Sequence, residues 1–533
     1  MILDLQHDSC PAEFDCDVAI AGAGAVGIMM AVELARQGVD VLLLEAGGAS
    51  LETSSQALYE ARCIGHPLTG LQNGRFRLLG GTTNFWGGQV LRFDPIIFEP
   101  RPWVASEGWP FGREDLDPYY DRCARQLGLA DDFSDADLWD RVGISSPDLG
   151  EHLDLFLTRC LRNRNLAHVF KADLEGAALR AIVHANVVGL SADDRGERIT
   201  GLQIRTLAGK SASVRAKRVV LACGTIEISR LLMLPLADGR VAPWAANEWL
   251  GKGFLDHIEA NAGSVRILDK EAFHHIFDNL YFHGLKYHPK IKLSAVGQKA
   301  ADALEVAGRF EFRSNYAEHL TNLKLFARSV LNGRLPANAK QLPAHLAAVW
   351  RVALPLVVRY LKSNRAFNPA DAGVDFMLMS EQLPTSKSRI VLASETDALG
   401  LPKVEVDWTI DGRETATMAS FTERVRDAMR RLGLADIDIA PLLAARDPSF
   451  LLTAQDYYHQ MGGARMGASA QNGVVDADLQ VYGSQNLYVA GAAVYPFSGF
   501  GNPTYTAMAL GLRLNDHLLG QRSWKQSRSQ VAA

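Results

Sequence analysis

The chain has 533 residues, of which 48% are hydrophobic, and its net charge is −5 at pH 7. A chain of this length can bury a large core and is expected to form two domains or one large composite unit. The small negative charge, without a basic stripe, argues against nucleic acid as a partner. Six scattered cysteines form no C-x-x-C pair and no Cys/His cluster, so we expect no metal site and a reducing compartment.

Nothing in the sequence predicts export or membrane insertion. The segment from Met1 to Glu13 has neither the basic stretch nor the apolar core of a secretory signal. No uncharged apolar run reaches the roughly 18 residues that a spanning helix needs. We therefore expect a cytoplasmic protein.

The first ordered signal is a glycine-rich turn between an apolar strand and a helix. The strand starts at Asp17 and leads into Gly22-Ala23-Gly24-Ala25-Val26-Gly27, and residues 28–37 then show helical periodicity. A second strand over residues 39–44 ends in Glu45. Such glycines let the backbone approach a pyrophosphate, and an acid about 20 residues further on meets a ribose hydroxyl. The alternative is an ordinary βαβ turn, but the order of strand, turn, helix, strand and acid favours a dinucleotide site.

A second glycine-rich stretch runs from Arg77 to Gly88 and carries two aromatic residues, Phe85 and Trp86. A loop of this composition can lay its backbone amides against a flat ring. On composition alone it can equally be a surface loop that packs its own aromatic side chains.

The spacing of hydrophobic residues changes in the middle of the chain. Residues 218–224 read as a buried strand that ends at a tight turn and is followed by a helix over 227–234, which predicts a return to the first sheet. A long mixed region follows, in which residues 322–331 and 346–361 predict rather apolar helices. For the second helix we favour packing on its own domain, and the alternative is docking on a partner protein or a membrane surface.

The C-terminal block, residues 457–519, carries the candidate chemistry. It contains His459 in a glycine-rich loop, then a short apolar strand over 486–490, and then Asn502-Pro503 before a helix-patterned run. Asn before Pro predicts a helix start, with Asn502 as the N-cap and Pro503 at the first helical position. A histidine and an amide near a helix N-terminus suit proton abstraction beside developing negative charge. The alternative is a structural histidine and a simple cap.

Four stretches together make the chain resemble the glucose–methanol–choline (GMC) family of flavoproteins. They are the first glycine turn with the segment 44–48, the loop at 80–84, the Gly224 turn with the segment 251–257, and the C-terminal block. Their order and spacing span residues 15 to 520. The resemblance implies an α/β fold, α+β overall, in which a Rossmann-like FAD-binding domain is built from discontinuous segments. A substrate domain with a mostly antiparallel sheet and helices completes it.

The resemblance also implies a division of the chain. Residues 15–150 form the first part of the FAD-binding domain, residues 151–260 are mixed and return to it, residues 261–450 form the substrate-binding domain, and residues 451–522 complete the FAD-binding domain with the active-site loops.

The implied site has His459 as the base and Asn502 as the residue that holds the alcohol oxygen. The residues expected at the FAD are Gly22, Gly24, Ala25, Val26, Gly27, Glu45, Ala46, Gly80, Gly81, Thr82, Asn84, Phe85, Trp86, Gly87, Gly88, Gly224, Gly491, Ala492, Asn502, Pro503 and Thr504. Some members tether FAD through a histidine in the loop at 80–88. Phe85 lies about where that histidine would be, so we expect non-covalent FAD.

The chain is most similar to the branch with pyranose oxidases, fructose dehydrogenase-type subunits and glucoside dehydrogenases. The implied reaction is oxidation of an alcohol group, CH–OH to carbonyl, of a sugar, glycoside or polyol, with oxygen, a quinone or a cytochrome as the final acceptor. The alternatives are a flavin-dependent lyase, a fatty-acid photodecarboxylase and a non-catalytic flavin-binding protein.

Overall fold

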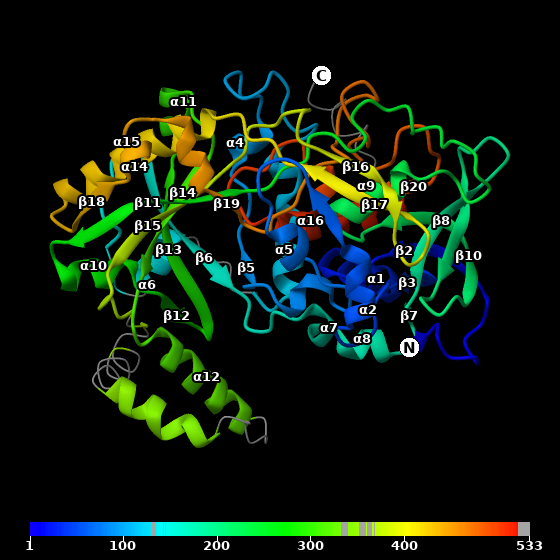
Figure 1. Ribbon diagram of the computed structural model, residues 1–533, viewed down its shortest axis with the longest axis horizontal. Helices are drawn as coiled ribbons and strands as arrows, with labels where there is room; N and C mark the ends of the chain where they lie inside the picture. The colour runs from blue at the N-terminus through cyan, green and yellow to red at the C-terminus, as the bar shows by residue number, and fades with distance from the viewer. Residues whose placement is uncertain are drawn as a thin grey trace.

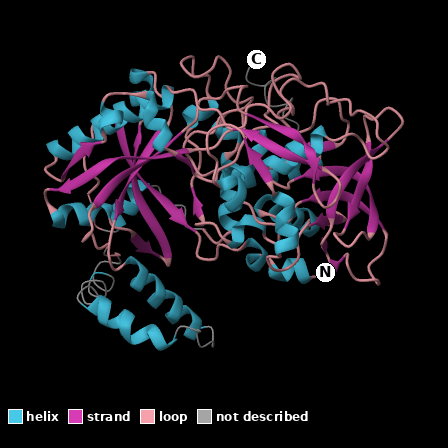
Figure 2. Cartoon of the chain, in the orientation of Figure 1, coloured by secondary structure: helices cyan, strands magenta, loops and turns pink. Residues whose placement is uncertain are grey.

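The computed structural model describes residues 1–129, 135–141, 143, 145–331, 339–350, 359, 365–366 and 368–520. Two sheets lie side by side, each with helices packed against it, and each has its own large apolar core (Figures 1 and 2). The expected fold class, a Rossmann-like α/β unit beside a unit with a mostly antiparallel sheet, is confirmed.

The first sheet is parallel at its centre. Its strand order is β1 (Ile2–Asp4), β7 (Arg180–Val183), β3 (Val41–Leu44), β2 (Glu13–Ala21), β10 (Ser211–Leu221), β9 (Ile199–Arg205) and β8 (Asn186–Ala192). A short strand, β20 (Leu487–Val489), also runs parallel to β10. Because β2 and β3 are buried along their inner residues, they read as continuous apolar runs, as a sheet covered on both faces requires. The sheet thus gathers segments from three distant parts of the chain.

Helices from both ends of the chain cover this sheet. The helix α1 (Ala25–Arg36) packs against α16 (Pro503–Leu518), which in turn packs against α5 (Asp117–Gln126). The contact is close because Gly511 has no side chain, and a Cβ there would lie 3.0 Å from Met30 and from Val26. A hydrogen bond also links α16 to α1, because Asn515 Nδ2 donates to the Met30 carbonyl at 3.1 Å. This packing brings the turn before α1 and the turn before α16 to the same end of the sheet.

The second sheet is mainly antiparallel. Its order is β18 (Ala435–Ile439), β11 (Ile258–Ile267), β15 (Val374–Ser380), β14 (Val306–Phe312), β13 (Leu285–Leu293), β6 (Leu153–Cys160) and β5 (Gln89–Val90), with β12 (Leu280–Phe282) on β13 and β19 (Gln455–Asp456) on β11. One face packs on α14 (Arg413–Arg431) and forms the second core. The other face carries charged side chains.

Smaller elements complete the two units. A three-stranded sheet joins β16 (Arg389–Thr396), β17 (Pro402–Asp407) and β4 (Ala61–Cys63). The remaining helices are α2 (Thr53–Gln56), α3 (Gly70–Asn73), α4 (Pro95–Phe98), α6 (Asp135–Arg141), α7 (Leu166–Val169), α8 (Lys171–Glu175), α9 (Thr225–Met233), α10 (Lys270–Phe277), α11 (Ala295–Ala301), α12 (Ala317–Leu331) and α15 (Pro441–Ala444).

The helix expected over 322–331 is confirmed as part of α12, which stands out from the body of the molecule with a second helical segment (Figure 1). Of the helix expected over 346–361, residues 346–350 are helical, whereas 351–358 and 360–361 lie outside the described residues. Leu325, Leu346 and Trp350 in this region are more than half exposed. Among the described residues, no helix is long and apolar enough to cross a membrane.

Candidate active site

Three neighbouring strands end at a strip of bare backbone. The strands β2, β10 and β20 run parallel and adjacent, and each is soon followed by a glycine: Gly24, Gly224 and Gly491. A Cβ built on any of these glycines would meet nothing within 4 Å. Ligands of doubly wound sheets bind at the carboxyl ends of the strands. The strip therefore offers room for a flat or extended ligand to touch the main chain.

The three glycines of the first turn have the different roles that the G-x-G-x-x-G pattern predicts. Gly22 has φ +109, and a Cβ on it would lie 2.6 Å from the Ala222 carbonyl oxygen. A Cβ on Gly27 would lie 1.9 Å from the Gly22 oxygen. Gly22 and Gly27 thus hold the turn and the helix close to the sheet, while Gly24, the N-cap of α1, faces open space.

Glu45 follows β3 and is 7% exposed. Its carboxylate accepts hydrogen bonds from the Ala23 amide at 3.1 Å and the Gly47 amide at 2.9 Å, which fix it beside the first turn. Burial raises the pKa of Glu45 to about 7, although these amides oppose that shift. A carboxylate has further lone pairs beyond those the amides use, so Glu45 can also accept from a ribose hydroxyl.

The loop at 80–88 lies directly against the first turn. The Gly80 amide donates to the Ala23 carbonyl at 2.9 Å, and a Cβ on Gly81 would lie 3.1 Å from the Gly24 Cα. Phe85 is 54% exposed and its ring lies 4.1 Å from that of Phe76. The two glycine-rich stretches, whose contacting residues are 57 positions apart in sequence, thus share one site.

The other expected cofactor residues of this loop have local roles as well. Asn84 donates from Nδ2 to the carbonyls of residues 79 and 81 and so closes the turn. The indole of Trp86 donates to the Arg164 carbonyl at 2.7 Å. Thr82 and Gly87 are exposed, and Gly88 is buried against the Arg164 side chain.

The remaining expected cofactor residues lie at helix starts or strand ends around the strip. Ala25 and Val26 open α1, Pro503 and Thr504 open α16, Ala492 follows Gly491, and Ala46 follows Glu45.

His459 and Asn502, the expected reacting pair, are brought together. Asn502 Nδ2 lies 3.1 Å from His459 Nε2, and His459 Nδ1 lies 2.8 Å from Nδ1 of a second histidine, His257. The two imidazole rings meet edge to face, with centroids 4.9 Å apart. Amide hydrogens on Asn502 point to Nε2, so we assign the lone pair of His459 to Nε2 and its proton to Nδ1.

Asn502 differs from the expectation in one respect. It occupies the N-cap position of α16, with Pro503 as the first helical residue, but its side chain makes no capping hydrogen bond. The amide turns towards His459 instead, and its buried Oδ1 has no hydrogen-bond partner among the described residues. That oxygen and the adjacent Nε2 can both meet a hydroxyl group.

Asp256 holds the His459 loop in place. This carboxylate is fully buried, and its Oδ1 accepts from the amides of His257 at 2.7 Å, His459 at 2.9 Å and Tyr457 at 3.2 Å. Burial raises the pKa of Asp256 well above its usual 3.8. The three amides fix the backbone on both sides of the histidine pair, so the loop that carries His459 has little freedom to move.

Both histidines are neutral in this setting. Burial lowers the pKa of His257 to about 4. Burial also lowers the pKa of His459 well below 6.5, and the nearby His257 and Lys290 lower it further. The neutral form, which can accept a proton, is therefore strongly favoured in both rings.

The histidine loop is tied to the glycine strip. The Gly462 amide donates to the Ala492 carbonyl at 3.0 Å, and the Thr225 hydroxyl donates to the Gln460 carbonyl at 2.8 Å. Ala492 and Thr225 directly follow the open glycines of β20 and β10. A ligand lying along the strip thus ends next to His459 and Asn502.

Sequence reasoning missed His257 and Asp256 as site residues. The Asp-His dipeptide was visible as part of the resemblance, but its partners lie about 200 residues away in the chain. A buried carboxylate that accepts from three amides has no local sequence signal.

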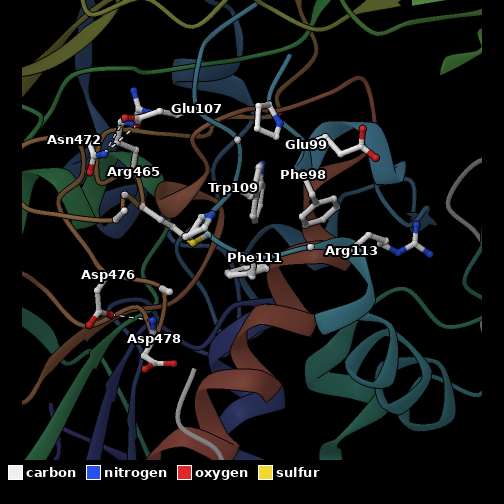
Figure 3. A pocket seen from close by; sticks show the side chains of 18 of the residues that line it. Phe98, Glu99, Glu107, Trp109, Phe111, Arg113, Arg465, Asn472, Asp476 and Asp478 are labelled. Atoms are coloured by element: carbon white, nitrogen blue, oxygen red, sulfur yellow. Dashed lines mark hydrogen bonds between the residues drawn. The ribbon is translucent and has the colours of Figure 1, made fainter. Parts of the chain in front are cut away.

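A separate pocket of about 820 Å³ lies between the segment 95–114 and the segment 465–482 (Figure 3). Its walls include Phe98, Trp109 and Phe111, with Glu107 and Arg465 nearby. Neither His459 nor Asn502 lines it. In the part of the chain that the structure describes, no group of three His, Cys, Asp or Glu side chains could hold a metal ion.

The residues at the strip fit FAD. The open glycines accommodate a pyrophosphate against bare backbone, Glu45 suits a ribose, and the loop at 80–88 offers amides and aromatic side chains to a flat ring. These residues would hold the cofactor.

Comparisons with known families agree with this geometry. Residues 17–247 match the family model described as FAD dependent oxidoreductase, and residues 384–511 match the model described as GMC oxidoreductase. The two matched ranges contain the glycine strip, Glu45, the loop at 80–88, His459 and Asn502.

Individual proteins match over nearly the whole chain. Paromamine 6'-oxidase from Streptomyces fradiae is 24% identical, over 93% of this chain and 90% of its own. The fructose dehydrogenase large subunit from Gluconobacter japonicus is 22% identical, over 94% of this chain and 97% of its own. The solved structure of pyridoxine 4-oxidase from Mesorbium loti has the same fold, with a TM-score of 0.59, 18% identity, and coverage of 95% and 100%. Over nearly its whole length the chain is similar to GMC oxidoreductases, and it is an FAD-dependent enzyme.

Proposed function

We propose that this enzyme oxidises an alcohol group, CH–OH to carbonyl, of a sugar, glycoside or polyol. The observation that carries the proposal is the contact between His459 and Asn502 at 3.1 Å, beside the strip that fits FAD. Relatives named as paromamine 6'-oxidase and fructose dehydrogenase support the substrate class.

His459 acts as the base in this proposal. On binding, the hydroxyl of the alcohol replaces the Asn502 amide as the donor to the single lone pair of His459 Nε2. The Asn502 amide then donates to the alcohol oxygen, which fixes the orientation of the substrate. The O–H proton passes to Nε2, and the electrons of that bond form the carbonyl as hydride leaves the carbon. When bound, the flavin ring supplies the acceptor for that hydride.

His257 and Asp256 position the base. The Nδ1–H of His459 donates to His257 Nδ1, so the proton stays on the far nitrogen and Nε2 keeps its lone pair. Asp256 fixes the loop that carries the ring. After proton transfer the imidazolium can still donate to His257, whose neutral ring accepts.

The N-terminus of α16 points into the same region. Pro503 starts this helix, and its positive end favours negative charge that develops nearby. The effect is worth about 0.3–1 kcal/mol in water and more in a site that excludes water.

The test is anaerobic bleaching of the yellow holoenzyme by a panel of sugars and polyols. Bleaching by an alcohol supports oxidation. Bleaching by none would favour a lyase, a photodecarboxylase or a non-catalytic flavin protein. The intact His459–Asn502 pair argues against the last of these. Reoxidation assayed with oxygen, a quinone and a cytochrome identifies the electron acceptor.

The FAD is proposed to be non-covalent, because Phe85 has no nitrogen that could bond to the flavin. A cytoplasmic location is proposed because all six cysteines are free, as in proteins of a reducing compartment.

Docking through the segment 322–361 also stays a proposal, and an anionic membrane surface is the occupant that its charge favours. Lys and Arg outnumber acidic residues eight to one between residues 317 and 365, in a chain with a net charge of −5. Exposed Leu325, Leu346 and Trp350 would lie in the lipid headgroup region. Cosedimentation with phosphatidylserine vesicles, but not with phosphatidylcholine vesicles, is the expected result, and no sedimentation with either contradicts it.

A further inference from the structure

The charged face of the second sheet lies beside the candidate active site. Lys290 on β13 is the cross-strand partner of Phe156 on β6, so both side chains lie on the same face. The Phe156 ring packs on that of Phe500 at 5.4 Å, two residues before Asn502. On the same face, Arg309 lies over the Tyr457 ring at 5.6 Å, and that ring is 5.0 Å from His459.

Two cations near Lys290 on this face, Lys292 and Arg309, have carboxylate partners. Lys292 pairs with Asp94. Arg309 donates to Glu259 at 2.6 Å and to Glu311 at 2.9 Å. The positive charge of these two side chains is balanced by the protein itself.

Lys290 is the exception. It is only 5% exposed, and its Nζ donates to Gln89 Oε1, a neutral amide oxygen, at 3.0 Å. No carboxylate pairs with Lys290 in the described part of the chain. Burying an ammonium without a counter-ion is costly. Burial and the neighbouring Arg309 accordingly lower the pKa of Lys290 to about 7.

The side-chain NH₂ group of Gln89 is a further potential donor next to Lys290. Lys290 offers only hydrogens, and the Thr158 hydroxyl also donates to Gln89 Oε1, at 3.2 Å, so the amide oxygen faces both. The Gln89 NH₂ group is therefore turned away from Lys290. A planar group with two oxygens could accept from the ammonium and from this amide together.

The positive charge of Lys290 acts on the two histidines of the site. It lowers the pKa of both His459 and His257. Gln89 follows the loop at 80–88 by one residue, and a Cβ on Gly87 would lie 4.0 Å from Gln89 Nε2. Lys290 therefore contacts the residue that follows the loop expected at the flavin, and its charge acts on the candidate base.

We propose that Lys290 and Gln89 bind a carboxylate of the substrate, so that the preferred substrate is an alcohol that also carries a carboxylate group. The inference rests on the proposed alcohol oxidation and narrows its substrate class. The carboxylate of the substrate is then the counter-ion of Lys290. The hydroxyl-bearing carbon of the substrate lies beside His459.

The experiment is equilibrium binding of acetate and of its neutral isostere acetamide to the oxidised holoenzyme, followed by calorimetry and by the change in flavin absorbance. The parent enzyme is expected to bind acetate about tenfold more tightly than acetamide, the difference between a charge-assisted and a neutral hydrogen bond. Lys290→Met should abolish this preference and Lys290→Arg should keep it. Lys299→Met, which removes an exposed lysine after the same strand, should also keep it.

Equal binding of acetate and acetamide by the parent enzyme would overturn the proposal. So would a preference for acetate that survives in Lys290→Met. Tighter binding of inorganic phosphate than of acetate would assign the site to phosphate esters instead. Acetate binding is read without turnover, so an enzyme that no alcohol reduces would contradict the proposed oxidation while leaving the anion preference intact.

Discussion

His459 and His257 meet through their Nδ1 atoms, 2.8 Å apart. One nitrogen must carry a proton and the other a lone pair, so the contact fixes the tautomer of His459. Because Asn502 donates to Nε2, the proton of His459 lies on Nδ1 and His257 is the acceptor. His257 is thus a positioning residue that keeps Nε2 ready to accept a proton.

Replacing His257 tests this role. His257→Leu should slow reduction of the flavin by the alcohol about tenfold or more, because His459 loses its orientation and its fixed tautomer. His257→Gln, whose amide oxygen can accept from Nδ1–H, should be faster than His257→Leu. Anaerobic stopped-flow traces at matched flavin content give both rates. Equal rates for the two variants would show that the hydrogen bond between His459 and His257 does not contribute to the reaction.

The pH dependence of flavin reduction follows from the burial of the histidine pair. Only neutral His459 can accept the proton, and burial lowers its pKa well below 6.5. The base is therefore already deprotonated at pH 6.5, and the acid limb of the rate profile should lie below that pH. The reduction rate from pH 5 to 9 is the measurement. A half-maximal rate at or above pH 6.5 would show that burial does not control this group.

The two glycines of the first turn should respond differently to substitution. A side chain on Gly24 would enter open space, so Gly24→Val should fold but lose FAD, because the side chain pushes the pyrophosphate away. Gly27→Ala places its Cβ 1.9 Å from the Gly22 oxygen and should impair folding itself. Flavin content and far-UV circular dichroism of the two purified variants separate these effects. Full flavin occupancy in Gly24→Val would mean that another part of the chain cradles the cofactor.

The linkage of the cofactor is tested by denaturation. The loop at 80–88 contains no histidine, and the half-exposed ring of Phe85 packs on Phe76. Acid or heat should therefore release all the flavin into the supernatant. Yellow precipitated polypeptide would contradict the proposed non-covalent binding.

Local sequence signals predicted the framework of the fold well. The runs that became α1, β3, α9 and α16 were expected within a few residues of their observed bounds, because each has a glycine, asparagine or proline at its boundary. The strand expected over residues 218–224 is longer than predicted, because β10 begins at Ser211 and ends at Leu221. The glycine turn was predictable for the same reason, since its chemistry lies in adjacent residues.

Contacts between distant segments were not predictable in this way. The partners of His257 come from the loop at 457–459, and the lone amide partner of Lys290 comes from β5. Asn502 is a further example. Its position predicts a capping hydrogen bond at the start of α16, but its side chain contacts His459 instead. The domain boundaries, and the roles of His459 and Asn502, stay predictions.

We propose His459 as the base and Asn502 as the residue that orients the alcohol. The direct test is anaerobic stopped-flow reduction of His459→Ala and Asn502→Ala by the alcohol that bleaches the parent, at matched flavin content. His459→Ala should keep its FAD and reduce about 10²–10⁴-fold more slowly, the usual contribution of a positioned base. Asn502→Ala should lose less, since it removes orientation alone and no capping hydrogen bond. Reduction of His459→Ala at the parental rate, or a slower reaction in Asn502→Ala, would contradict the assignment.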